Sequence, residues 1–319
     1  MPRLLAGLML LVAFSMASPA IAQSASDAAG RVVEVEVAAP ALAGNLLGTP
    51  SVQRAAVYLP PGYDQEPDRR YPAVYLLHGI FDDYGVWLEF FDVPAMLDRL
   101  IAAGDLPELV LVMPNGGNQY GGGFYRNSPI SGHWGDYIAD DLVGFIDAEF
   151  RTLAGKDSRA VLGHSMGGYG ALHLGMTRPE IFSVVWAMSP CCLAAIDDFS
   201  FGNDAWRRAS QVASEEDLES LFANDDFYPV AALGVVTAFS SDQDQPTLYG
   251  DFPFDIVRGE VVLDDAAYDR YLDALPIRQV RAAREALRGL RGLGLGVGLG
   301  DQVAIIGSIV EHHFAAHDV

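Results

Sequence analysis

The chain has 319 residues, 50% of them hydrophobic, and a formal net charge of -22 at pH 7. A chain of this length can bury one large core or two modest ones. Its negative charge repels phosphate backbones and anionic membrane surfaces, so the composition argues against nucleic acid as a partner.

The N-terminus has the pattern of an export signal. An arginine near the start precedes an apolar run that ends at Met16, and small residues follow up to Ala22. This order predicts a signal peptide over residues 1–22, cleaved before Gln23, and a secreted or periplasmic mature protein. The apolar run is shorter than the roughly 20 residues that a membrane anchor needs. We therefore expect no membrane span in the mature chain.

Strand and helix patterns alternate through the rest of the chain. Alternating or continuous apolar runs predict strands at 31–40, 54–63, 71–79, 106–114, 182–190 and 293–301, and residues 158–168 are predicted as a strand that enters a tight turn. Helical spacing predicts helices at 92–104, 136–150, 170–180 and 277–292, the first of them ending on a glycine. This alternation predicts a mostly parallel, doubly wound α/β sheet flanked by helices.

Residues 196–274 interrupt this alternation with segments that are rich in aspartate and contain aromatic residues. We interpret the stretch as a lid-like insertion within one domain that spans residues 23–319. Ligands of such sheets bind at the carboxyl ends of the strands. The functional site is therefore expected at that edge.

The pentapeptide GHSMG at residues 163–167 fits the pattern G-x-S-x-G, with a predicted strand entering it and a predicted helix leaving it. In this context the motif predicts a strained turn that presents Ser165 at the top of the sheet. The N–H of Met166 and a second N–H, assigned to Ile80 in the loop at 76–83, would hold an oxyanion. The alternative is a glycine-rich packing turn.

Several segments between residues 57 and 189 resemble one family. They are VYLPPGY, YPAVYLLHGIFDDYGVW, VMPNGG, DDLVGFIDAEFRT and GHSMGGYGAL, in that order. The chain resembles the esterase D-like ("putative esterase") branch of the α/β-hydrolases, which includes S-formylglutathione hydrolases, feruloyl esterases, enterochelin esterases and mycolyltransferases. The resemblance implies an α/β-hydrolase fold and hydrolysis through an acyl-enzyme on Ser165, with Met166 and Ile80 as the oxyanion hole. It implies no cofactor and no metal.

A serine nucleophile needs a histidine base and an acid that orients it, in the chain order serine, acid, histidine. Asp301 ends the last predicted strand and is placed like the acid, the alternative being a solvated loop aspartate. The segment after it is shorter than the family pattern, which gives the fold a shortened C-terminal end. His312, His313 and His317 are the candidate bases, and His317 is expected nearest the catalytic edge. Each has the alternative of an exposed tail residue.

The other histidines receive structural interpretations. His78 and His164 belong to motifs in which the family's histidine is structural or variable. His173 is interpreted as a packing residue of the helix that follows the nucleophile. The chain has two cysteines, Cys191 and Cys192, which either form a strained vicinal disulfide or remain two buried thiols. Two sulfurs alone make no metal site.

Two functional hypotheses follow from these residues. The first is a secreted serine esterase acting on a small-molecule or glycan ester. The second is a catalytically impaired relative that binds an acyl or glycan ligand, and an acyltransferase would use the same acyl-enzyme. Aromatic residues between the predicted strands either line an acyl or sugar pocket or pack the loops. These residues are Trp87, Phe90, Tyr120, Phe124, Tyr125 and Trp134.

Overall fold

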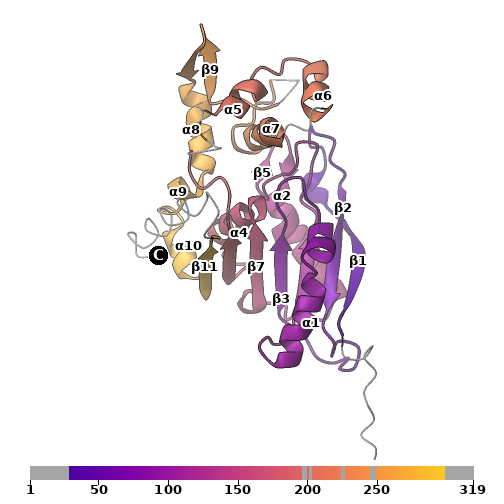
Figure 1. Ribbon diagram of the computed structural model, residues 1–319. Helices are drawn as coiled ribbons and strands as arrows, with labels where there is room; N and C mark the ends of the chain where they lie inside the picture. The colour runs from indigo at the N-terminus through magenta and orange to yellow at the C-terminus, as the bar shows by residue number, and fades with distance from the viewer. Residues whose placement is uncertain (1–28, 196–199, 201–202, 224–226, 245–248, 299–319) are drawn as a thin grey trace, which may run out of the picture.

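The computed structural model describes residues 29–195, 200, 203–223, 227–244 and 249–298 (Figure 1). The predicted signal peptide, Asp301 and the three C-terminal histidines lie outside these residues. Within the described ranges, no helix has both the length and the apolar character needed to cross a bilayer.

The central sheet has seven strands in the order β1-β2-β4-β3-β7-β8-β11 (Figure 1). Their bounds are β1 (Arg31–Ala38), β2 (Val52–Leu59), β3 (Ala73–Leu77), β4 (Val110–Pro114), β7 (Arg159–His164), β8 (Val184–Met188) and β11 (Gly292–Gly296). β2 pairs antiparallel with β1 and with β4, and every other pair in the sheet is parallel. The predicted mostly parallel sheet is confirmed.

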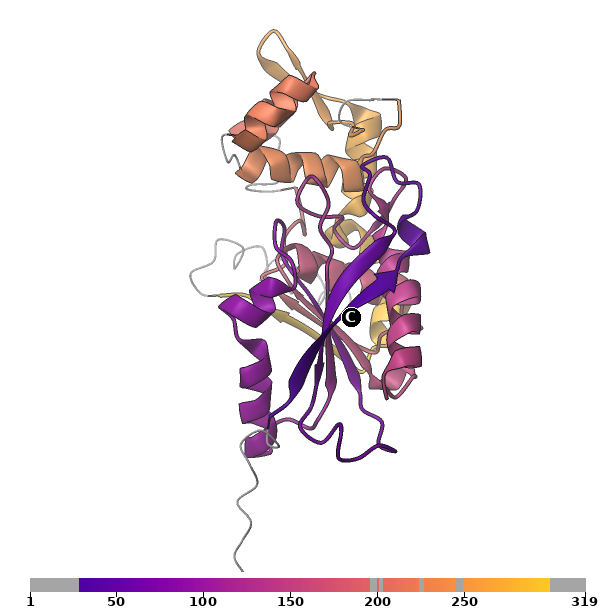
Figure 2. The same ribbon diagram turned by 90° about the vertical axis from the view of Figure 1, so that its right-hand side faces the viewer.

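Helices cover both faces of this sheet. Successive side chains of a strand point to opposite faces, so the apolar side chains on each face are buried under helices. In β2, Val57 packs in the larger core cluster and its neighbour Tyr58 in the smaller one. The smaller cluster lies under α1 (Val93–Ala103), and the larger one under α3 (Val143–Glu149) and α4 (Met166–Thr177). Figure 2 shows α1 on one side of the sheet and the pink helices on the other. The doubly wound arrangement is confirmed.

The remaining short elements connect these layers. They are η1 (Pro40–Leu42), η2 (Val86–Phe90), β5 (Asn127–Ser128), β6 (Gly132–His133), α2 (Trp134–Asp136), η3 (Tyr137–Leu142) and η4 (Lys156–Ser158). α2, η3 and α3 follow one another directly, so the helix predicted at 136–150 is present with a π-helical middle turn. α1 ends at Ala103 and is capped by Gly104, whose φ of 77° is the left-handed conformation that favours glycine.

The prediction of one continuous helix at 277–292 is wrong. The structure has two short helices there, α9 (Pro276–Gln279) and α10 (Arg284–Arg288). The turn between them lets Val280 and Leu287 both enter the larger core cluster, while Arg281 stays exposed. Tertiary packing therefore overrides the helical spacing at this point.

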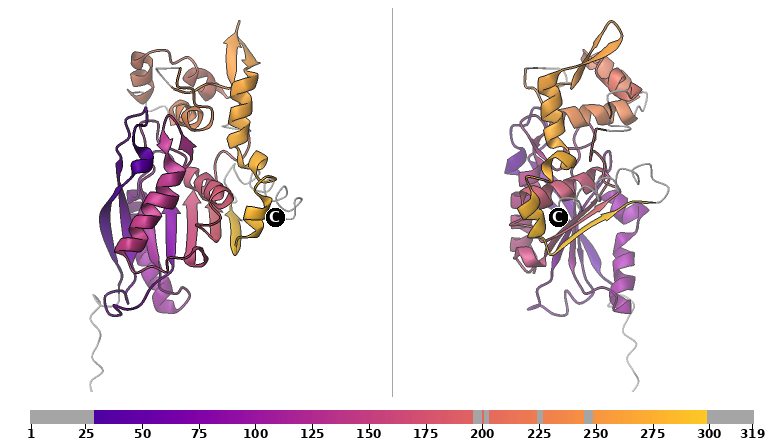
Figure 3. Two further views of the ribbon diagram at one scale, coloured as in Figure 1. Left: turned by 180° about the vertical axis from the view of Figure 1, so that it is seen from behind. Right: turned by 90° about the vertical axis from the view of Figure 1, so that its left-hand side faces the viewer.

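The segment from 203 to 274 lies beyond the carboxyl ends of the parallel strands (Figure 3). Its elements are α5 (Asp204–Ala209), α6 (Glu215–Ala223), α7 (Phe227–Phe239), the hairpin β9 (Phe254–Val257) and β10 (Glu260–Leu263), and α8 (Asp265–Ala274). α7 is apolar on all sides and buried for most of its length, as such helices are. The hydrogen bonds that tie the described part of this segment to the sheet domain include one from Ser128 Oγ to Thr237 O at 2.7 Å and one from Tyr169 Oη to Ala274 O at 2.9 Å. Its role as a lid stays a prediction.

His173 is buried in α4 and stacks on Tyr169, with ring centroids 5.9 Å apart and an interplanar angle of 8°. Burial, assisted by the charges of Arg126 and Arg178, lowers the pKa of His173 to about 3. The unfolded chain takes up this proton near pH 6.5, so the stability contribution of His173 is complete above that pH and is lost as the pH falls toward 3.

We expect His173→Phe, which keeps an aromatic ring against Tyr169, to flatten this pH dependence. Between pH 6 and 4 the free energy of unfolding of the wild type should fall more steeply, by about 1.4 kcal/mol per pH unit. Urea denaturation of both proteins at several pH values measures the difference. Parallel slopes would show that His173 is protonated in the folded state as readily as in the unfolded chain.

Candidate active site

Ser165 occupies a strained turn between β7 and α4. Its φ of 53° and ψ of -116° fall in a region that residues other than glycine rarely adopt. Three backbone bonds fix it: Ser165 N–H donates to Met188 O at 3.0 Å, and Ser165 O accepts from Tyr169 at 3.0 Å and from Cys191 at 3.1 Å. The strain persists because the surrounding backbone over-determines it.

The two flanking glycines are required by close backbone approaches. A Cβ on Gly163 would overlap the backbone carbonyl of Gly167, and a Cβ on Gly167 would overlap the carbonyl of Leu77. Backbone atoms cannot move aside as a flexible side chain can. The G-x-S-x-G spacing is therefore a packing requirement of the turn that holds Ser165.

We expect Gly163→Ala to lower the free energy of unfolding by about 3 kcal/mol and to reduce activity, because relieving the overlap must shift the turn. Gly144→Ala in α3 is the matched control, since a Cβ there meets no atom within 4 Å. That substitution should stabilise the helix by about 0.5–1 kcal/mol. Urea denaturation separates the two variants, and equal stabilities would contradict the packing argument.

The loop that follows β3 lies directly beside Ser165. A Cβ built on Gly79 would stand 3.7 Å from the Cβ of Ser165. Among the described residues, neither the N–H of Ile80 nor that of Met166, the first residue of α4, has a hydrogen-bond acceptor. The structure thus brings Ser165, Met166 and Ile80 together. A helix N-terminus favours a negative charge that develops beside it.

His78 connects the loop after β3 to the loop after β4. Its Nδ1 donates to Gly79 O at 2.7 Å, and its Nε2 accepts from Gly116 N–H at 2.8 Å. Burial lowers the pKa of His78, which agrees with the neutral form that these bonds require. A second bond, from Phe81 N–H to Gly121 O at 2.9 Å, joins the same loops. His78 therefore positions the backbone on which Ile80 sits.

An apolar cavity of ≈ 240 Å³ opens above Ser165. Ile80 and Phe124 line it from the sheet domain. Trp206 of α5 and Ala232 of α7 line it from the segment beyond the strands. Residues of α5 and α7 were not predicted from the sequence to contribute to the site. The signal that would have found α7 is the nearly unbroken apolar run PVAALGVVTAF.

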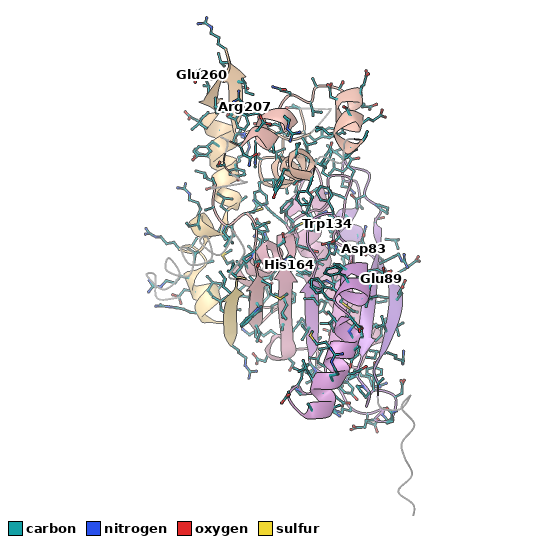
Figure 4. The ribbon with its side chains drawn as sticks, viewed as in Figure 1. Asp83, Glu89, Trp134, His164, Arg207 and Glu260 are labelled. Atoms are coloured by element: carbon teal, nitrogen blue, oxygen red, sulfur yellow. The ribbon has the colours of Figure 1, made fainter. Side chains whose placement is uncertain are left out.

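Of the two alternatives for the aromatic residues between the strands, packing of the loops holds for most of them. Phe124 lines the cavity, whereas Tyr120, Tyr125 and Trp134 are fully buried in the core. Trp87 packs in the cluster under α1. Phe90 is 80% exposed at a separate hollow near Asp83 and Glu89 (Figure 4). Most of these rings stabilise the loops because their large apolar surfaces find buried partners there.

Among the described residues, no histidine hydrogen-bonds to the side chain of Ser165. His164, beside Ser165, is exposed (Figure 4). Both His164 and Asp82 lie close to Gly79. A Cβ built on Gly79 would stand 3.9 Å from His164 Nδ1 and 3.0 Å from the Asp82 carboxylate. Asp301 and His317, together with His312 and His313, fall outside the described residues.

Both cysteines are free thiols in the structure. Cys192 is buried, but Cys191 is half-buried and lines the cavity, so the interpretation as two buried thiols is correct for one of them. Their Sγ atoms lie 2.7 Å apart. In the part of the chain that the structure describes, no group of three or more histidine, cysteine or acidic side chains is arranged to hold a metal ion.

Comparisons with known proteins bear on this geometry. A profile of the "Putative esterase" family matches residues 49–245. Esterase Rv1288 of Mycobacterium tuberculosis is 39% identical over 121 residues, which are 36% of this chain and 24% of that protein. An endo-1,4-beta-xylanase/feruloyl esterase of Xylanibacter ruminicola is 33% identical over 145 residues, 42% of this chain and 19% of that protein. The matches thus span a quarter or less of these relatives.

Solved structures agree in fold. A fluorophosphonate-binding serine hydrolase of Staphylococcus aureus superposes with a TM-score of 0.57 at 16% identity, covering 90% of this chain and 87% of that one. An S-formylglutathione hydrolase of the same species gives 0.54 at 14% identity, covering 91% and 88%. At these identities the likeness establishes the fold, which is that of the α/β-hydrolases.

Proposed function

This chain belongs to the Esterase family, and we propose that it is a secreted serine esterase that hydrolyses carboxylic esters through an acyl-enzyme on Ser165. The observation that carries the proposal is the strained position of Ser165 at the base of an apolar cavity and at the N-terminus of α4. A turn that costs about 1–3 kcal/mol to hold a hydroxyl at such a place supports a nucleophilic role.

In the proposed reaction, Ser165 Oγ attacks the ester carbonyl while a histidine takes its proton. The N–H groups of Met166 and Ile80 stabilise the oxyanion, and the leaving alcohol departs with the proton from the histidine. Water then attacks the acyl-enzyme by the same steps and releases the acid. We propose His317 as the base and Asp301 as the acid that orients it.

The cavity is proposed to hold the acyl group. Its volume of ≈ 240 Å³ is small for a ligand site, and its walls are mostly apolar. A compact acyl group would fill it, while the alcohol part of the ester, a small molecule or a glycan, would remain outside. One relative carries the name feruloyl esterase, which supports carboxylic esters as the substrate class.

The proposal is tested by how the acyl group divides between water and an added alcohol, because every ester of one acid should pass through the same acyl-enzyme. p-Nitrophenyl acetate and phenyl acetate should give the same ratio of methyl acetate to acetate when methanol is added, because both pass through one intermediate. A ratio that depends on the leaving group would contradict an acyl-enzyme. Exclusive transfer to methanol would identify an acyltransferase instead.

The mass of the recovered protein tests whether the chain is exported and cleaved. The N-terminal pattern supports cleavage before Gln23, so the chain recovered from the exported fraction of a bacterial host should have the intact mass of residues 23–319. Recovery of the full-length mass from the cytoplasm would contradict this part of the proposal.

Ala232 lies in the cavity wall and is expected to limit the length of the acyl group. We expect Ala232→Val to lower kcat/KM for p-nitrophenyl butyrate about tenfold relative to p-nitrophenyl acetate, because the added methyl groups occupy the space of the longer chain. Ala238→Val, on the same helix but away from the cavity lining, is the matched control. An unchanged preference in the Ala232 variant would place the acyl group elsewhere.

A further inference from the structure

The two adjacent cysteines lie beside Ser165, and neither sulfur has a role in the proposed esterase reaction. They follow β8 in the loop that leads into the segment beyond the strands, and their Sγ atoms are 2.7 Å apart. Bonded sulfurs lie about 2.05 Å apart, so closure requires a movement of less than about 1 Å. The loop therefore holds the two thiols close to the geometry of a vicinal disulfide.

The loop is also in direct contact with the nucleophile. Cys191 N–H donates to Ser165 O at 3.1 Å, and Cys191 lines the same cavity as Ser165. Cys192 has a φ of 57°, so the link between the two cysteines is already constrained. A covalent change between the two sulfurs would act on the backbone that fixes Ser165.

We propose that Cys191 and Cys192 form a reversible vicinal disulfide by exchange with a small-molecule disulfide that reaches the Ser165 cavity, and that this modification slows acylation of Ser165. The second part rests on the proposed function, whereas the first stands on the positions of the two sulfurs alone.

The chemistry takes place in two exchanges. Cys191 is exposed to the cavity, so its thiolate attacks the external disulfide, forms a mixed disulfide and releases one thiol. Cys192 then loses its proton and attacks Cys191 Sγ, which closes the ring and releases the second thiol. Both cysteines are oxidised and the external disulfide is reduced to two thiols. Burial raises the pKa of the Cys192 thiol, which favours Cys191 as the first nucleophile.

The expected consequence at Ser165 follows from the shared hydrogen bond. The ring of a vicinal disulfide changes the backbone dihedrals of Cys191, so its N–H moves relative to Ser165 O. A displacement of a fraction of an ångström at a nucleophile lowers its reactivity measurably. We expect the rate constant for fluorophosphonate labelling to fall about tenfold in the oxidised protein.

The test uses the full chain incubated with oxidised glutathione and analysed by intact-mass spectrometry. The wild type should lose two hydrogen atoms, take up no N-ethylmaleimide after denaturation, label about tenfold more slowly with the fluorophosphonate, and recover on reduction with dithiothreitol. Cys192→Ser should instead retain one glutathionyl group on Cys191, and Cys191→Ser should remain unmodified. In the double variant the labelling rate should not respond to the oxidant.

Three results would overturn the proposal: no loss of hydrogen, a disulfide between two chains, or equal labelling rates before and after oxidation. A protein that loses two hydrogen atoms but is labelled in neither state would support the disulfide and contradict the proposed function. The mass and the labelling therefore separate the two claims.

Discussion

Replacement of Ser165 with alanine is expected to lower kcat for p-nitrophenyl acetate by about 10⁴-fold or more. The variant keeps the cavity and the N–H groups of Met166 and Ile80, so it should still bind the ester and polarise its carbonyl. It lacks the oxygen that is proposed to form the acyl-enzyme. Initial rates with the wild type and the variant, each corrected for the buffer rate, measure the loss.

A matched serine controls for nonspecific effects of this substitution. Ser183 is buried just before β8, its hydroxyl has no partner among the described residues, and it does not line the cavity. Ser183→Ala should therefore retain wild-type turnover. A Ser165→Ala variant that unfolds at the wild-type urea concentration but keeps more than a tenth of the activity would remove Ser165 from the mechanism.

Replacement of His317 with alanine is expected to lower kcat by about 10³-fold or more, because the serine hydroxyl then has no group to take its proton. His312→Ala and His313→Ala are the matched controls in the same short segment and should retain most of the activity. Initial rates with p-nitrophenyl acetate compare the three. The wild type should also show kcat/KM rising with pH to a plateau above about pH 7, as a histidine base becomes neutral.

The same comparison of variants also shows which residue acts as the base if it is not His317. A loss in the His312 or His313 variant would move the base along the same segment. If none of the three affects turnover, the base lies elsewhere, and His164 beside Ser165 becomes the residue to replace. A folded wild type with no turnover at all would match the catalytically impaired relative considered from the sequence.

The sheet and the turn that holds Ser165 follow from local patterns. The continuous apolar runs at β3, β4 and β7 belong to strands covered on both faces, where each residue finds a core on one side or the other. The spacing of Gly163, Ser165 and Gly167 can be read from the sequence because backbone contacts at both glycines exclude any Cβ. These features depend on neighbours in the chain or on the strand period.

The cavity could not be predicted in the same way, because it depends on where distant segments meet. Trp206 and Ala232 enter the site through the packing of α5 and α7 over the carboxyl edge of the sheet, and no motif marks them. The positions of the loop aromatics could not be predicted for the same reason. Tyr125, for example, is wholly buried, but the same local sequence would also fit a residue that lines a pocket. The break between α9 and α10 likewise follows from what Val280 and Leu287 contact.

The proposed function requires Ser165 to be an activated nucleophile. Intact-mass spectrometry after treatment with a fluorophosphonate probe tests it most directly, with Ser165→Ala in parallel and peptide mapping of the adduct. We expect one adduct per chain, located on Ser165 and missing from the variant. A folded wild-type chain that takes up no probe, or one whose adduct persists in the variant, would contradict it.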